Sequence, residues 1–134
     1  ALGKVLMMDS DPNEITEILA TDPMTELTEF TITDPETFIE KLGQVRKQGF
    51  ALDDRESSLD SRCVGAPIRD REGRIIGALS VSGPLNRMTG AYLKSTVVPI
   101  LLKVTKEISE ALGYDEAQLS HKMKSKTKKR RDSV

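Results

Sequence analysis

The stretch RCVGAPIRDREGRIIGALSVSGP, residues 62–84, decides the fold. Two apolar runs, residues 62–68 and 74–82, flank the polar turn Asp70-Arg71-Glu72-Gly73, and a glycine at this place is typical of a tight turn. Their β-branched and aliphatic residues suit a pleated, half-buried surface. Pro84 stops the second run because it has no N–H group for strand pairing. We therefore predict a β-hairpin.

Small residues are frequent in this hairpin, and they allow two interpretations. They are Gly65, Ala66, Gly77 and Ala78, together with Cys63, Ser80 and Ser82. One interpretation is that a helix packs closely on the sheet. The other is that the sheet face is hollow and forms a small-molecule pocket. The pattern alone favours close packing.

Helices are predicted on both sides of the hairpin from apolar residues at helical spacing. Proline near each helix start supports residues 12–20 and 35–48, and Gly49 supports the end of the second helix. A long helix over 89–112 contains Pro99, which should bend or break it. Residues 1–8 are helix-compatible, 28–33 and 49–52 are predicted as short extended pieces, and 53–61 as a polar loop.

The composition is ordinary for one domain, but the charge is divided unevenly. The 134 residues are 31% charged and 37% hydrophobic, with one cysteine and no apolar run of the roughly 20 residues that a membrane helix needs. We expect a cytoplasmic protein with no membrane contact. Residues 121–134 hold seven Lys or Arg and one Asp, whereas residues 1–120 carry a net charge of −7. Residues 115–134 are therefore predicted to be a disordered basic tail, either solubilising or able to bind nucleic acid non-specifically.

Catalytic chemistry is hard to assemble from these residues. The one histidine, His121, lies in the basic tail, so neither Cys63 nor Ser80 has an obvious base for hydrolysis. The sequence has no metal-ligand spacing and no phosphate-binding glycine loop. We predict no enzymatic activity, no metal and no cofactor.

The order of several motifs resembles the effector-binding domain of IclR-family transcriptional regulators. They are ALGK, TITDPE, RKQGFALDD, SRCVGAPIRDREGRIIGALSVSGPLNR and EISEALGY, and the resemblance extends over about residues 1–114. The resemblance implies an α+β, GAF-like domain with a curved antiparallel sheet flanked by helices. It also implies that the winged helix-turn-helix that binds DNA, and the strands that usually precede ALGK, are absent from this chain.

The resemblance further implies a pocket for a small organic acid. It carries the site onto the backbone amides of Ala1 and Leu2, and onto Asp53, Ser61, Cys63, Ser80 and Ser82. The family often has an apolar residue at the place of Ser61. Their spacing puts Ser80 and Ser82 on one sheet face. For each position, packing in the core remains the alternative.

Two functions follow as hypotheses. In the first, residues 1–114 sense an organic acid, and binding alters operator binding or the assembly of dimers and tetramers. In the second, the domain is a non-sensing dimerisation module, and the basic tail binds nucleic acid non-specifically.

Overall fold

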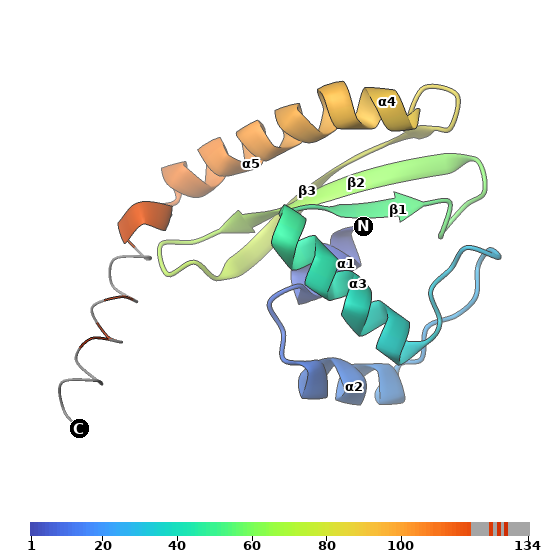
Figure 1. Ribbon diagram of the computed structural model, residues 1–134, viewed down its shortest axis with the longest axis horizontal. Helices are drawn as coiled ribbons and strands as arrows, with labels where there is room; N and C mark the ends of the chain where they lie inside the picture. The colour runs from blue at the N-terminus through green and yellow to red at the C-terminus, as the bar shows by residue number, and fades with distance from the viewer. Residues whose placement is uncertain (119–123, 125, 127, 129–134) are drawn as a thin grey trace.

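A three-stranded antiparallel sheet lies between two layers of helices in the computed structural model, which describes residues 1–118, 124, 126 and 128 (Figure 1). The elements in chain order are α1 (Leu2–Met7), α2 (Pro12–Thr21), α3 (Pro35–Gln48), β1 (Ala51–Asp54), β2 (Ser61–Arg69), β3 (Ile75–Pro84), α4 (Gly90–Tyr92), the π-helical turn η1 (Leu93–Val97) and α5 (Val98–Ala111). The predicted α+β class is confirmed. None of the described helices has both the length and the hydropathy needed to cross a membrane.

The predicted hairpin is present as β2 and β3, with β1 added on the other side of β2. In the turn, the Asp70 N–H donates to the Arg74 carbonyl at 2.9 Å, and Gly73 has a φ of 80°. Glycine adopts this left-handed conformation without the strain that a Cβ would cause. Ile68 pairs with Gly77 and Arg69 with Ile75, so Ile76 is the extra residue of a bulge on β3.

The predicted helices are confirmed as α2 and α3, and capping side chains begin both of them. The carboxylate of Asp11 accepts the Asn13 N–H at 2.7 Å, and that of Asp34 accepts the Thr37 N–H at 3.1 Å, so each caps a helix start. Gly49 ends α3 with a φ of 85°.

The prediction of an extended piece at residues 28–33 is wrong. The Thr31 hydroxyl accepts the N–H groups of Leu27 and Thr28 at 3.1 and 2.9 Å, which closes a turn. Threonine side chains that bond to nearby backbone groups compete with strand formation in this way.

The short strand predicted at 49–52 lies two residues later, at Ala51–Asp54. The predicted loop therefore loses Asp53 and Asp54 to β1, where Asp53 pairs with Cys63 and Asp54 with Arg62. The two carboxylates point to opposite sheet faces, as the sequence predicts for adjacent extended residues.

The long C-terminal helix is interrupted as Pro99 predicts, but by a wider turn. In η1 the Val98 N–H donates to the Leu93 carbonyl, five residues back. The buried face then continues every fourth residue, through Leu93, Val97, Leu101, Thr105 and Ser109. Val104 and Ile108, which lie beside this face, are only partly buried, and Leu112 is exposed.

The hydrophobic core has a part on each sheet face. Val64 and Ala66 of the central strand pack with Leu93, Val97 and Leu101 on one face. On the other face, Ala51 packs with Val5 of α1, with Met8 directly after α1, and with Val45 of α3. Most of the predicted basic tail lies outside the described residues, although residues 116–118 form a helical turn.

Candidate ligand-binding site

Polar residues from all three strands share one face of the sheet. Cys63 lies opposite Asp53 on β1 and Ser82 on β3, while Gly65 lies opposite Ala51 and Ser80. Residues paired across an antiparallel ladder project to the same face. The register therefore brings together Asp53, Cys63, Ser80 and Ser82. Ser61 precedes Cys63 by two residues on β2, so it lies on the same face.

The start of α1 lies against this polar face. A Cβ added to Gly65 would meet the Ala1 Cβ at 3.4 Å and a Val5 methyl at 3.3 Å, so the absent side chain lets α1 approach the sheet. The Ala1 nitrogen lies 3.9 Å from an Asp53 carboxylate oxygen. Ala1 thus joins the predicted group, whereas Leu2 is an exposed residue of α1.

Asp53 is held in one orientation at this junction. One carboxylate oxygen accepts the Glu56 N–H at 2.9 Å, and the other accepts the Ser57 hydroxyl at 2.7 Å. Each oxygen has a second lone pair, so the carboxylate can still accept a hydrogen bond from a ligand.

A cavity of about 400 Å³ opens beside Ala1 and Asp53, between α1, α2, the start of α3 and the 53–57 turn. Its apolar wall is formed by Met7, Leu19, Met24, Ile32 and Phe38. An apolar wall with a few polar groups at one end is typical of small-molecule sites. Of the predicted site residues, the described lining includes Ala1 and Asp53. Leu2, Ser61, Cys63, Ser80 and Ser82 lie outside it.

A nearly buried ion pair, Lys4 with Glu56, lies in the wall of this cavity. The Lys4 ammonium donates to the two Glu56 carboxylate oxygens at 2.6 and 2.5 Å and to the Leu52 carbonyl at 2.8 Å. The sequence reasoning missed this pair. The signal was available, because a lysine in the apolar segment ALGKVLMM needs a partner when the segment packs.

Glu56 also fixes the segment that covers the cavity. Its carbonyl accepts the hydroxyl of Thr31, and the Thr28 hydroxyl donates to the Arg55 carbonyl at 2.6 Å. The Arg55 guanidinium lies over the Phe30 ring, 4.1 Å from its centre. The 53–57 turn therefore connects α1, β1 and the 27–32 turn around one space.

A second ion pair lies on the opposite sheet face. Asp54 accepts a hydrogen bond from Arg62 at 2.8 Å, and this bond lowers the pKa of the Asp54 carboxyl below 3.8. Arg62 in turn donates to the Met88 carbonyl at 3.0 Å, which ties the sheet to the start of α4.

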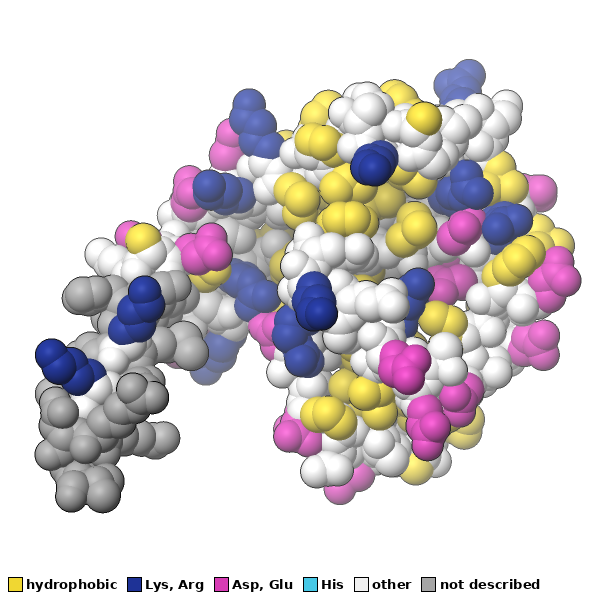
Figure 2. Space-filling model, in the orientation of Figure 1, with side chains coloured by type: hydrophobic (Ala, Val, Ile, Leu, Met, Phe, Trp, Pro, Cys, Tyr) yellow, Lys and Arg dark blue, Asp and Glu magenta, His cyan; other side chains and the backbone are white. Residues whose placement is uncertain are grey.

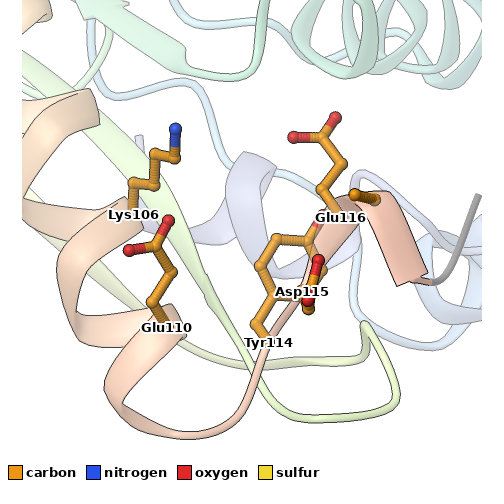
Figure 3. Close-up of a pocket in the computed structure, with 6 residues that line it drawn as sticks. Lys106, Glu110, Tyr114, Asp115 and Glu116 are labelled. Atoms are coloured by element: carbon orange, nitrogen blue, oxygen red, sulfur yellow. The ribbon is translucent and has the colours of Figure 1, made fainter.

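Another cavity, of about 540 Å³, lies where α5 ends (Figure 3). Lys106 and Glu110 project from α5, and Tyr114, Asp115 and Glu116 face them across the opening. Burial raises the pKa of the Tyr114 hydroxyl. Three carboxylates against one lysine disfavour an organic acid there, so we place the candidate site at Ala1 and Asp53 instead. No group of three or more potential metal ligands occurs among the described residues.

Comparison with known proteins explains this arrangement. Residues 1–110 match the family described as Bacterial transcriptional regulator IclR C-terminal. The chain belongs to the IclR family. The fold of this IclR-type domain is accordingly that of an effector-binding domain.

Two relatives from Escherichia coli show how much of an IclR protein the chain represents. It is 36% identical over 116 residues to the HTH-type transcriptional regulator KdgR, and this alignment covers 87% of this chain and 44% of KdgR. It is 31% identical over 111 residues to the transcriptional repressor IclR, covering 83% and 40%. The chain thus spans less than half the length of these curated relatives, which are transcriptional regulators and not enzymes.

Solved IclR-type domains have the same architecture. The crystal structure of the C-terminal domain of E. coli KdgR aligns with a TM-score of 0.77 at 37% identity, covering 85% of this chain and 69% of that one. The inducer-binding domain of a PobR double mutant from Acinetobacter, in complex with 3-hydroxybenzoic acid, aligns with a TM-score of 0.77 at 31% identity, covering 81% and 62%.

Proposed function

We propose that this domain senses a small organic acid for a DNA-binding transcriptional regulator that acts in the cytoplasm. The observation that carries the proposal is the junction of the polar sheet face with the 400 Å³ cavity at Ala1 and Asp53. Family membership supports it, and PobR shows that a relative's domain holds an aromatic hydroxy acid.

The residues present suit such a ligand. Hydroxyls at Ser80 and Ser82 and backbone N–H groups at Ala1 and Leu2 are donors for a carboxylate, while Asp53 accepts a hydrogen bond from a ligand hydroxyl. An apolar part of the ligand would lie in the cavity wall. No step of this proposal requires a catalytic residue.

A ligand at this junction would contact α1, β1 and β3 at once. In the full regulator, we propose that it changes how the domain assembles into dimers or tetramers, or how a winged helix-turn-helix binds its operator. The open edge of β3 fits this proposal. Within the described residues no strand pairs with that edge, and Ile76, Leu79 and Val81 of β3 are exposed side chains that a partner could cover.

The test is a thermal-shift screen followed by calorimetry with acetate, lactate, succinate, gluconate and 3-hydroxybenzoate. An acid at 100 times its Kd should stabilise the domain by about 2.7 kcal/mol. Replacing both serines, Ser80→Ala with Ser82→Ala, should weaken binding about tenfold, since two hydrogen bonds are lost. The matched control is Ser95→Ala, an exposed serine on η1. If no acid stabilises the protein, or if the double variant binds as tightly as the control, the proposal fails.

A second function is favoured by the separation of charge between the acidic body and the basic tail. In this alternative the domain does not sense a ligand, and residues 121–134 bind nucleic acid non-specifically. Binding of duplex DNA would then fall steeply with salt and disappear when residues 121–134 are removed. DNA binding that survives this deletion would exclude the tail as its source.

A further inference from the structure

A separate apolar cavity of about 390 Å³ lies on the opposite face of the sheet, between β1, β2 and the α4–η1–α5 layer. Figure 2 shows hydrophobic side chains gathered between the helical layer at the top and the strands beneath it. The cavity is lined by Phe50, Leu52, Val64, Gly90, Leu93, Lys94 and Val98. None of these residues belongs to the candidate effector site.

The floor of this cavity is part of the hydrophobic core. Leu52 and Val64 are cross-strand partners on the face that α5 covers, and Val64 and Leu93 are buried. Phe50, Leu52 and Val98 are only partly buried against the same cluster. The cavity is therefore a hollow that opens at the surface of this cluster. An apolar ligand would bind there because binding removes apolar surface from water.

Lys94 gives the cavity its chemical preference. Among the described lining residues it alone carries a charge, and it is exposed on η1 at the cavity mouth. Among the described residues no carboxylate forms an ion pair with it. A lysine stem lies along apolar surface while its ammonium group remains in water. The cavity therefore presents an apolar floor with a single cation at the rim, which complements a carboxylate that has an apolar body.

The mouth of the cavity is open beside Gly90. A Cβ built on Gly90 would meet no atom within 4 Å, so this position limits neither entry nor the size of the ligand. The π-helical turn that carries Leu93 and Lys94 is of a kind that occurs frequently at functional sites.

The geometry points to a second ligand site, which takes an apolar monocarboxylate such as a medium-chain alkyl acid. The alkyl chain contacts Leu52, Val64 and Leu93, and the carboxylate pairs with the Lys94 ammonium. This site is independent of the effector site, because the sheet separates the two.

Calorimetric titration of the 134-residue chain with octanoate and octylamine tests the assignment. Octanoate should bind saturably and at least tenfold more tightly than octylamine, which has the same chain and the opposite charge. Lys94→Gln should weaken octanoate binding about tenfold, while Lys103→Gln, an exposed lysine on α5, should have no effect. Gly90→Leu should abolish binding by filling the mouth, and Gly43→Leu on α3 is its matched control because a Cβ there also meets open space.

Several results would overturn the assignment. Equal binding of octylamine, or no effect of Lys94→Gln, would remove the carboxylate from it. Loss of octanoate binding in the Ser80→Ala, Ser82→Ala double variant would place octanoate on the other sheet face. Sedimentation velocity provides a further check. A wild-type dimer that Gly90→Leu converts to a monomer would show that a second copy of the chain covers the cavity instead. Lys94→Gln alters an exposed side chain, so the test remains decisive if Gly90→Leu fails to fold.

Discussion

Replacing Lys4 with methionine tests the ion pair that organises the candidate site. The side chains of Lys4 and Glu56 are only 8% and 16% exposed. Lys4→Met keeps a similar apolar stem but leaves the Glu56 carboxylate without its cation, and it leaves the Leu52 carbonyl without its donor. Removing one partner of a buried pair costs about 3–5 kcal/mol. Because Glu56 retains some contact with water, we expect the free energy of unfolding to fall by about 2–3 kcal/mol.

Urea unfolding at neutral pH measures this loss, and a thermal scan should show a Tm lower by about 10 °C for a domain of this size. Lys41→Met is the matched control, because Lys41 is an exposed lysine on α3, and its effect should stay within about 0.5 kcal/mol. The double variant Lys4→Met, Glu56→Leu removes both charges, so it should recover about 1–2 kcal/mol of the loss.

The same variant should loosen the cover of the cavity. Without Lys4, the 53–57 turn loses its ion pair with α1, and amides of the 27–32 turn should exchange faster with deuterated water. The reasoning is refuted if Lys4→Met behaves like Lys41→Met, or if the double variant loses as much stability as the two single changes added together.

Three further changes probe the frame around the site. Ser109→Ala should cost about 1–3 kcal/mol, because the buried hydroxyl accepts the Arg69 N–H at 2.9 Å beside the bulge and the variant leaves that N–H unpaired. Gly73→Ala should cost about 1 kcal/mol by chemical unfolding, since alanine is strained at a φ of 80°. Asp54→Asn should destabilise the domain by about 0.5–1 kcal/mol at pH 7. Because the folded pKa of Asp54 lies below 3.8, this difference should be full above pH 3.8 and vanish as the pH falls through the folded pKa.

Each of these three predictions has a control variant or a result that would contradict it. Ser95→Ala, on the exposed side of the same helical layer, should change stability by less than 0.5 kcal/mol, and a similar cost for Ser109→Ala would contradict the bulge contact. Gly43→Ala should be neutral or slightly stabilising, because alanine favours the helix. A stability difference for Asp54→Asn that persists unchanged at pH 2.5 would contradict the charge pair as its cause.

Local signals in the sequence account for much of the fold. The hairpin turn at residues 70–73 and the capped starts of α2 and α3 depend on neighbouring residues, so the sequence alone predicts them. The 28–33 turn was missed, because the Thr31 hydroxyl closes it locally with Leu27 and Thr28 while the Thr28 and Thr31 hydroxyls also bond to Arg55 and Glu56, 27 and 25 positions away. The burial of Thr105 and Ser109 was hidden for a similar reason. The π turn before Pro99 rotates the following helix, and a regular helical period does not contain that rotation.

The candidate site divides in the same way. Strand alternation places Ser80 and Ser82 together, and the family resemblance adds Asp53 and Cys63. The register confirms that these four share a face, while their role as ligand contacts stays a prediction. The cavity beside Asp53 depends on how α2 and α3 pack, which no local pattern contains. The sequence did contain one signal of this region, because Lys4 lies in an apolar segment and needs a partner when that segment packs.

An NMR titration of the ¹⁵N-labelled chain with 3-hydroxybenzoate and the smaller acids tests the central claim most directly. We predict saturable shifts at the amides of Asp53, Cys63, Ser80 and Ser82, with smaller shifts at Val64 and Val81 on the opposite face. The shifts should be lost in the Ser80→Ala, Ser82→Ala double variant. Shifts confined to the α5 side of the sheet, or none with any of the acids, would contradict the assignment of the effector site.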